Sequence, residues 1–326
     1  MITDPLPRVS LAQLPTPIAR LPRMSAQMGG AALWIKRDDQ TGLALGGNKT
    51  RKLELLVAEA EARDARTLIT RGALGSNHCR QTAAAAATRG LRSILVLRSE
   101  PPASTNGNLL LDHLLGADIV WTRGRDPETV LQETFRQAET DSLRPYLVPY
   151  GGSSPLGASA YAAALEECLA QGLVPNWIVL ASSSGGTQAG LVAGARLLGY
   201  AGKILGISVD PPASQLRPEV AALATEVCTL LGRPSEVAPQ EILVEDRFSA
   251  PGYAVLTQVE REAIGAFARQ EGILLDPVYT GRAAGGMLAL AREGRFKTGE
   301  LVLFWHTGGT PALFAFADSL AAEGAP

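Results

Sequence analysis

Cysteine is scarce in this sequence of 326 residues. The three that occur, Cys79, Cys168 and Cys228, lie far apart and are odd in number. This pattern excludes a disulfide scaffold, and it provides no CxxC pair for binding a metal or for redox chemistry. The scarcity of cysteine therefore favours a reducing compartment.

The sequence also lacks an excess of charge of either sign. It has 30 basic residues (Lys and Arg) and 32 acidic residues (Asp and Glu), so its formal net charge is −2. A protein that binds nucleic acid usually carries a basic field that attracts phosphates. We therefore expect no nucleic-acid partner.

No segment is suited to span a membrane. The longest uncharged stretch, residues 168–195, is interrupted by Pro175, Asn176 and the polar run SSSGG. We interpret it as a buried strand, a loop and a helix. The first residues, MITDPLPRVS, lack the basic start and apolar core of an export signal, so we expect a cytoplasmic protein.

Apolar residues make up 46% of the sequence and charged residues 19%, which is typical of a globular protein. Short apolar runs rich in β-branched residues alternate with longer helical patterns. Because these runs are continuously apolar, they predict strands covered on both faces, as in parallel sheets. The fold class is therefore α/β. The predicted strands are residues 32–36, 67–70, 93–98, 118–121, 176–181, 203–209 and 300–305.

The length suggests two domains that share a cleft. Helical patterns cover residues 50–62 and the alanine-rich segment 81–88, and four βα units fall between about residues 65 and 150. The turn YGGSSPLG (150–157) follows them and precedes a new helix. We predict a change of domain at this turn.

Lys49 follows two glycines in the segment GGNKTRK and directly precedes an amphipathic helix. The positive end of the helix dipole and partial burial both lower the pKa of a lysine, and a neutral amine is what Schiff-base chemistry needs. A surface lysine in a turn is the simpler interpretation. A P-loop is a third, but Asn48 separates the glycine from the lysine where the P-loop pattern has them adjacent.

A turn rich in hydroxyl groups and glycine, SSSGGTQAG, lies between a predicted buried strand and a helix. Ser184, Gly185, Gly186 and Thr187 can direct backbone N–H groups and hydroxyls at one phosphate, helped by the dipole of the following helix. The pattern GxGxxG is absent, so a dinucleotide is not indicated. The alternative is a turn that needs glycine for steric reasons alone.

A second turn, GSNHCRQTA, presents Ser76, Asn77 and His78 at the start of the alanine-rich helix. Exposed N–H groups there can bind a substrate carboxylate. Serine and asparagine are also ordinary helix N-caps, so the turn alone leaves both interpretations open.

These segments, together with LDPVYTGRAAGGM (275–287) and HTGGTPALF (306–314), occur in one order along nearly the whole chain. The set resembles the pyridoxal-phosphate fold type II family of D-cysteine desulfhydrase, 1-aminocyclopropane-1-carboxylate deaminase and L-cysteate sulfo-lyase. The resemblance implies a two-domain fold like that of the tryptophan synthase β subunit, and usually a homodimer. The large domain would comprise residues 1–50 and 156–326, the small domain residues 51–155, with the cofactor in the cleft between them.

The resemblance also implies which residues hold pyridoxal 5'-phosphate. Lys49 would bind the cofactor covalently, and Asn77 would bond its phenolic oxygen. Lys52, with residues 184–187, would hold the phosphate. Thr307 would lie near the pyridine nitrogen.

Three further residues are implied for the substrate side. Ser76 would face the substrate, Tyr279 would lie beside the cofactor ring, and Tyr253, in SAPGY (249–253), would be a second active-site tyrosine. Thr280 follows Tyr279 where the cyclopropane deaminases characteristically have a glutamate. A hydroxyl holds a pyridine nitrogen protonated less well than a carboxylate does, although Thr280 can also simply cap the next helix.

The resemblance and Thr280 together favour α,β-elimination on a small amino acid, foremost D-cysteine, giving pyruvate, ammonia and hydrogen sulfide. L-cysteate sulfo-lyase and the cyclopropane deaminase are the alternatives, because Leu74-Gly75 and Arg282 depart from the common pattern. A non-catalytic small-molecule-binding protein on the same fold is a further alternative.

Two other chemistries find little support. A serine hydrolase would pair Ser76 with His306 and Asp276, but the GxSxG pattern is absent. The three histidines, the others being His78 and His113, show no metal-ligand spacing, so we expect no metal site.

Overall fold

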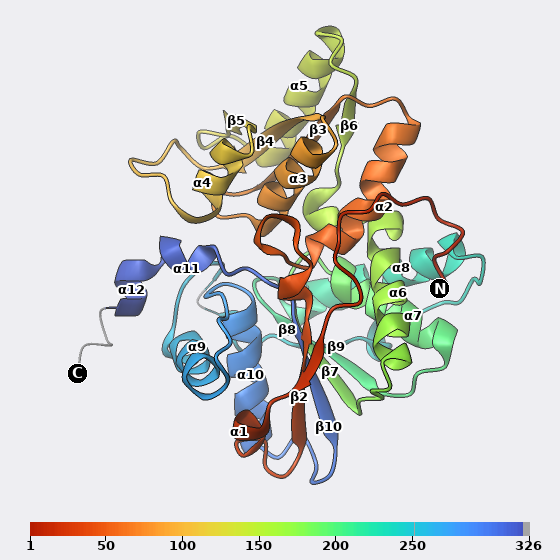
Figure 1. Cartoon of the computed structure of the whole chain (residues 1–326), viewed down its shortest axis with the longest axis vertical. Helices are drawn as coiled ribbons and strands as arrows, with labels where there is room; N and C mark the ends of the chain where they lie inside the picture. The colour runs from red at the N-terminus through yellow and green to blue at the C-terminus, as the bar shows by residue number, and fades with distance from the viewer. Residues whose placement is uncertain (251, 322–326) are drawn as a thin grey trace.

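The computed structural model describes residues 1–250 and 252–321, and this part of the chain forms two sheets, each covered by helices on both faces (Figure 1). The larger sheet has the strand order β1-β2-β10-β7-β8-β9 and the smaller β5-β4-β3-β6. The strands are β1 (Ile18–Arg20), β2 (Ala32–Arg37), β3 (Thr67–Ala73), β4 (Arg92–Arg98), β5 (Asp118–Trp121), β6 (Pro145–Leu147), β7 (Trp177–Ser182), β8 (Lys203–Ser208), β9 (Leu243–Glu245) and β10 (Leu301–His306).

Neighbouring strands are parallel in both sheets, except that β1 pairs antiparallel with β2. The α/β class and the mostly parallel pairing predicted from the continuously apolar runs are confirmed. The prediction missed β1, β6 and β9. Each is three residues long, too short to show a hydrophobic period.

Both faces of the larger sheet are buried. Along β10, Val302 and Phe304 pack into one core cluster while Leu303 and Trp305 pack into another on the opposite face, because successive side chains of a strand alternate. One face is covered by α1 (Pro22–Ser25), α9 (Gln258–Glu271) and α10 (Thr280–Arg292); the other packs against α6 (Pro155–Ala170) and α7 (Gly186–Leu198), with α8 (Ala213–Leu230) outside them.

The smaller sheet is layered in the same way. Ile69 of β3 and Val96 of β4 pack against one helix, while Leu68 and Leu95, next to them in sequence, pack against helices on the other face. The first face carries α5 (Pro127–Thr140), and the second carries α2 (Lys49–Ala62), α3 (Asn77–Thr88) and α4 (Gly107–Leu114). The alanine-rich helix begins at Asn77, four residues earlier than predicted, because Ser76 caps it.

The remaining elements are short. The chain's described part ends in α11 (Ala312–Ala315) and α12 (Ala317–Ala321), and single 3₁₀ turns occupy Asp38–Gln40, Leu43–Leu45, Tyr150–Gly152 and Pro239–Glu241. None of the helices in the described residues is long and apolar enough to cross a membrane.

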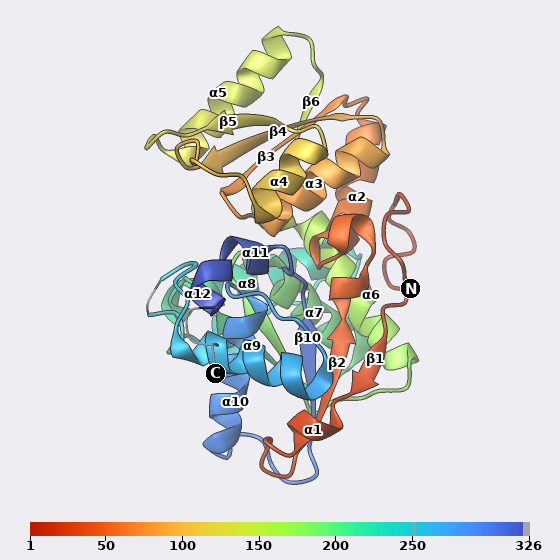
Figure 2. The same ribbon diagram turned by 60° about the vertical axis from the view of Figure 1, so that its left-hand side comes forward.

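The smaller sheet with its helices lies above the larger sheet in Figure 2, and α2 passes from one to the other. In an open α/β sheet, ligands bind at the carboxyl ends of the strands. The segments that follow β3, β7 and β10 line one common pocket. The predicted division into domains (1–50 with 156–326, and 51–155) stays a prediction, and its residues 251 and 322–326 lie outside the described part of the chain.

Candidate functional site

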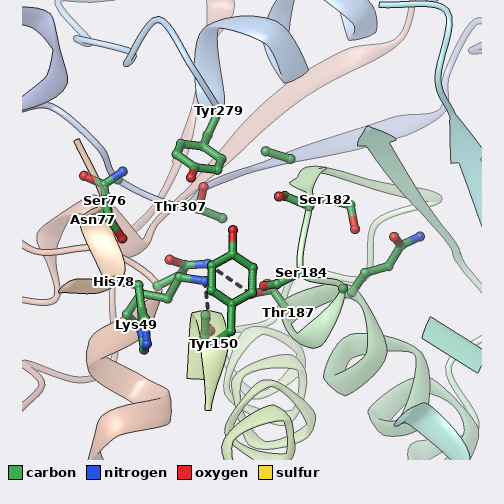
Figure 3. Close-up of a pocket in the computed structure, with 17 residues that line it drawn as sticks. Lys49, Ser76, Asn77, His78, Tyr150, Ser182, Ser184, Thr187, Tyr279 and Thr307 are labelled. Carbon is green, nitrogen blue, oxygen red and sulfur yellow. Dashed lines mark hydrogen bonds between the residues drawn. The ribbon is translucent and has the colours of Figure 1, made fainter. Parts of the chain in front are cut away.

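The pocket lies between the two sheets and, with its open mouth, holds about 630 Å³ free of protein atoms (Figure 3). Its walls come from the start of α2, the turn after β3, the 3₁₀ turn at Tyr150–Gly152, the turn after β7 and the turn after β10. The lining residues are Asn48, Lys49, Ser76, Asn77, His78, Tyr150, Gly151, Ala181, Ser182, Ser183, Ser184, Gly185, Thr187, Gln188, Tyr279, Thr307 and Gly308.

Lys49 is the first residue of α2 and is delivered to the pocket by a tight glycine turn. Gly46 and Gly47 have φ of +66° and +130°, and a Cβ on Gly46 would lie 1.9 Å from the carbonyl oxygen of Asp39. Glycine is therefore required here on both conformational and steric grounds. Lys49 Nζ donates to the carbonyl oxygen of Gly151 (3.0 Å), and burial lowers its pKa to about 8. About a tenth of this amine is then neutral and nucleophilic at pH 7.

Lys52 lies one turn further along α2, behind the pocket wall, and is fully buried. Its Nζ donates to the same carbonyl oxygen of Gly151 at 3.2 Å. Burial and, secondarily, the charge of Lys49 lower the pKa of Lys52 well below its usual value. Within the described residues no carboxylate pairs with either amine, so a bound anion would stabilise the charged form that burial disfavours.

The turn after β7 forms a cradle at the N-terminus of α7. Gly185 has a left-handed φ of +74°, and a Cβ on Gly186 would lie 2.4 Å from Ser153 Oγ and 2.8 Å from Lys52 Nζ. Ser184 Oγ shares a hydrogen bond with Ser153 Oγ (2.9 Å). Hydroxyls, an ammonium and the positive end of a helix thus meet around a backbone without side chains, which suits a phosphate.

Three buried polar atoms on the pocket wall lack hydrogen-bond partners among the described residues. They are His78 Nδ1, Ser182 Oγ and Gln188 Oε1. Gln188 Oε1 lies against Gly206 of β8, where a Cβ would be 2.2 Å away, so the unpaired atoms that a polar ligand in the pocket would satisfy are those of His78 and Ser182. Burial also lowers the pKa of His78 well below its usual value, so its ring is neutral.

Ser76 is the N-cap of α3, and its Oγ accepts a hydrogen bond from Cys79 N (3.2 Å). The two interpretations of this turn are compatible: the oxygen caps the helix while the hydroxyl hydrogen remains free to bind an acceptor in the pocket. Asn77 also lines the pocket.

Tyr279 lines the pocket and is joined to Tyr253 through their hydroxyls (2.7 Å), with the rings edge to face at 6.0 Å between centroids. Burial raises the pKa of Tyr253 to about 12 and raises that of Tyr279 well above its usual value. Both phenols therefore stay protonated at neutral pH. Tyr253 itself lies in the wall of an adjoining hollow.

Thr280 and Thr307 differ in their surroundings. Thr280 is fully buried outside the pocket lining; its Oγ1 donates to Asp276 Oδ1 (2.7 Å) and accepts from Asp276 N (2.8 Å). Thr307 lines the pocket, and its hydroxyl has no hydrogen-bond partner among the described residues. Thr307 is thus the threonine whose hydroxyl is available to a ligand.

Of the twelve residues assigned from the sequence to the cofactor or the substrate, eight line the pocket and four do not. Lining it are Lys49, Ser76, Asn77, Ser184, Gly185, Thr187, Tyr279 and Thr307. Lys52 and Gly186 lie directly behind the wall, Tyr253 touches it through Tyr279, and Thr280 is held in the Asp276 turn.

Sequence reasoning missed Tyr150 and Gly151, although both stand in the YGGSSPLG turn. Gly151 supplies the oxygen that both lysines share. The half-exposed ring of Tyr150 stands at the mouth, with the Arg71 guanidinium 4.7 Å from its centroid. The adjacent glycines Gly151 and Gly152 were the feature of the sequence that could have indicated this part of the site.

The hydrolase arrangement is not formed. His306 is fully buried, its Nδ1 accepts from Gly308 N, and its Nε2 lies 3.1 Å from the carbonyl oxygen of Leu274. The Asp276 carboxylate accepts the N–H groups of Val278, Tyr279 and Thr280 instead of a histidine. Among the described residues there is also no group of three metal-ligating side chains.

Comparison with known proteins identifies relatives of this chain. A family model described as "Pyridoxal-phosphate dependent enzyme" matches residues 9–308. The chain is 43% identical over 319 residues to a "D-cysteine desulfhydrase" from Yersinia enterocolitica, covering 95% of this chain and 96% of that protein. It is 41% identical over 321 residues to a protein of the same name from Salmonella typhi, again covering 95% and 96%.

Comparison with solved structures agrees with the comparison of sequences. The chain resembles the structure of an "ACC deaminase homologue" with a TM-score of 0.91 and 38% identity, covering 98% of this chain and 97% of the other. A fungal L-serine ammonia-lyase from Rhizomucor miehei has a TM-score of 0.69 at 15% identity, with 97% and 99% covered, which shows a shared fold.

Proposed function

The chain belongs to the family of pyridoxal-phosphate dependent enzymes, and from this premise we propose that it is a carbon–sulfur lyase that converts D-cysteine and water to pyruvate, ammonia and hydrogen sulfide. The observation that carries the proposal is the identity of 41–43% over 95% of the chain with D-cysteine desulfhydrases. The pocket supports it with two buried amines beside an anion cradle.

The donor set fits pyridoxal 5'-phosphate. The backbone and hydroxyls of residues 184–187, with the Lys52 ammonium behind them, would bind its phosphate. Lys49, with its lowered pKa, would bind its carbonyl carbon covalently, and Asn77 would donate to its phenolic oxygen. The hydroxyl of Thr307 is available to its pyridine nitrogen, whereas that of Thr280 is already engaged by Asp276.

When bound, the cofactor supplies an electron sink for the pair left as a bond to Cα of the amino acid breaks. The neutral amine of Lys49 would take the Cα proton as general base. The Ser76 hydroxyl would donate to the substrate carboxylate and so orient the Cα–H bond. Tyr279, protonated and hydrogen-bonded to Tyr253, would hold a proton at its hydroxyl oxygen beside the reacting atoms.

The reaction balances without a further reagent. The Cα–H and Cβ–S bonds break, a Cα–Cβ double bond forms, and hydrogen sulfide leaves. The released 2-aminoacrylate takes up one water and gives pyruvate and ammonia. No oxidant or reductant is consumed.

Opening of 1-aminocyclopropane-1-carboxylate is the second candidate, favoured by the likeness to a structure titled "ACC deaminase homologue". An assay of D-cysteine, L-cysteine, L-cysteate, β-chloro-D-alanine, D-serine and the cyclopropane amino acid separates the activities. Pyruvate and sulfide from D-cysteine support the desulfhydrase. Turnover of L-cysteate alone would assign the sulfo-lyase instead, and 2-oxobutyrate from the cyclopropane substrate would assign the deaminase.

The cellular setting belongs to the same proposal: a cytoplasmic homodimer acting on a small amino acid. Its three cysteines are free and buried, which agrees with a reducing compartment. Light scattering after size exclusion tests the assembly, since a homodimer has twice the 34.2 kDa of the chain.

A further inference from the structure

Asn108, the second residue of α4, lies directly behind the Ser76–Asn77 turn and is 1% exposed. Its Nδ2 donates two hydrogen bonds, one to the carbonyl oxygen of Gly75 (2.7 Å) and one to Asn77 Oδ1 (2.8 Å). An amide nitrogen has two hydrogens, so both are used on this one turn.

These two bonds fix which way the Asn77 amide faces. Its oxygen is taken by Asn108, whereas its Nδ2 has no partner among the described residues. Asn77 lines the pocket, so the group left for a ligand is an N–H donor and not an acceptor.

Helix α4 is itself held in place at this point. Gly107, with φ of +52°, packs so closely on α11 that a Cβ there would lie 3.0 Å from the carbonyl oxygen of Pro311 and 3.3 Å from Ala315 Cβ. Helix α11 follows the turn after β10, which contributes Thr307 and Gly308 to the pocket. Asn108 therefore connects the Asn77 turn to a helix braced against the opposite wall.

We propose that Asn108 is a positioning residue that holds Asn77 as a hydrogen-bond donor toward the phenolic oxygen of the bound cofactor. The proposal rests on the proposed function, because it needs pyridoxal phosphate in the pocket. A donor at that oxygen stabilises its ionised form, on which the visible absorption of the lysine-bound cofactor depends. Asn108 acts on this property through Asn77 and touches neither cofactor nor substrate.

Asn108→Asp is the sharpest test, because the side chain keeps its shape while the double donor becomes an acceptor. The amide of Asn77 must then turn its Nδ2 toward residue 108 and its oxygen toward the phenolic oxygen, where two acceptors repel. Asn106→Asp is the matched control: it adds the same charge to the exposed cap of the same helix, where the side chain makes no capping bond.

The measurements are the absorption spectrum of the loaded protein, the Kd for pyridoxal phosphate added to the apoprotein, and the melting temperature of the apoprotein. We expect Asn108→Asp to shift absorbance from the visible to the near-ultraviolet band and to raise the Kd about tenfold, the effect of one hydrogen bond. Asn106→Asp should match the wild type in both. Asn108→Ala, which adds no charge, should change the spectrum and the Kd in the same direction. It replaces Asn108→Asp in the test if the aspartate variant does not fold.

A double-mutant cycle tests the route of the effect. In an Asn77→Ala background, Asn108→Asp should change the spectrum no further, because its intermediary is gone. An additive shift would overturn the proposal, as would a loaded Asn108→Asp protein with the wild-type spectrum and Kd. A wild-type protein that takes up no pyridoxal phosphate would instead overturn the proposed function.

Discussion

The amines of Lys49 and Lys52 converge on one acceptor, the carbonyl oxygen of Gly151, at 3.0 and 3.2 Å. Two buried cations at one oxygen repel each other, and burial lowers the pKa of both. The arrangement suits two different roles: one amine stays neutral and acts as a nucleophile, and the other binds an anion. The first two predictions follow from this relationship.

We expect the apoprotein to take up pyridoxal phosphate faster as pH rises. The pKa of Lys49 is about 8 instead of 10.5, so its neutral, nucleophilic fraction grows up to about pH 8 and then levels off. The rate of colour formation should therefore rise nearly tenfold from pH 6 to 7 and be almost constant above pH 9. Lys49→Ala should form no covalent link at any pH. A plateau already at pH 6, or a rise that continues beyond pH 10, contradicts the prediction.

Lys52→Met should weaken cofactor binding and yet stabilise the apoprotein. The buried ammonium attracts the phosphate, so its loss should raise the Kd for pyridoxal phosphate by about 10–100-fold. In the apoprotein the same amine is buried without a carboxylate partner, and burial lowers its pKa well below the usual value, so replacing it with methionine should raise the melting temperature. Calorimetry and cofactor titration measure the two effects, and Lys297→Met, at an exposed site, is the control. A variant that is less stable but binds normally would disprove the role in phosphate binding.

Tyr253→Phe should lower kcat by about 10–100-fold and leave KM within about twofold, as expected when a proton-holding pair is broken but substrate binding is not. The lost contact is the 2.7 Å bond between the two tyrosine hydroxyls. Tyr200→Phe is the control, because it removes a hydroxyl bonded at 2.6 Å to the carbonyl oxygen of Pro175, away from the pocket lining. Equal kcat values for the two variants would show that the Tyr253 hydroxyl has no part in turnover.

Thr280→Val and Thr307→Val should have opposite consequences. The first removes the hydroxyl that ties Asp276 into its turn and should cost about 1–3 kcal/mol of stability with little change in the cofactor spectrum. The second removes an unpaired hydroxyl in the pocket, so the spectrum should change more than the stability does. Chemical denaturation and absorption spectra of both variants check this. A spectral change confined to the Thr280 variant would restore Thr280 as the residue at the pyridine nitrogen.

Asp112→Asn should stabilise the protein in a pH-dependent way. The Asp112 carboxyl is fully buried on α4 and neither oxygen has a hydrogen-bond partner among the described residues; burial raises its pKa to about 7, although the charge of Arg80 opposes the shift. Its folded pKa lies above its unfolded value, so the wild type loses stability as pH rises from about 4 to 7 and no more beyond. The advantage of the variant should grow over that window by about 2–4 kcal/mol. Urea unfolding at pH 4 and pH 8 measures it, and an equal difference at both values argues against the shifted pKa.

The class of the fold and every strand longer than three residues could be predicted from the sequence alone. Runs such as 177–180 (WIVL) and 301–305 (LVLFW) are continuously apolar because both faces of a parallel strand are covered, and such a run can be recognised from adjacent residues alone. The glycine turns could be predicted from the sequence in the same way. Gly46, Gly47 and Gly185 have left-handed backbone conformations or crowded surroundings that other residues rarely tolerate. Glycines at these positions in the sequence therefore indicate the turns.

The resemblance to a family indicated the principal residues of the site, but their contacts with one another follow only from the folded structure. No local pattern could indicate that Lys49 and Lys52 share the oxygen of Gly151, about 100 residues away, or that Thr280 turns from the pocket to Asp276 while Thr307 lines it. Asn108 carried no signal of its own, because a single asparagine near a helix start is ordinary. Its bond to Asn77 spans 31 residues and exists because β3 and β4 pair side by side, which brings α3 and α4 together over one face of the sheet. Such contacts depend on packing between distant segments, and packing is settled only when the chain has folded.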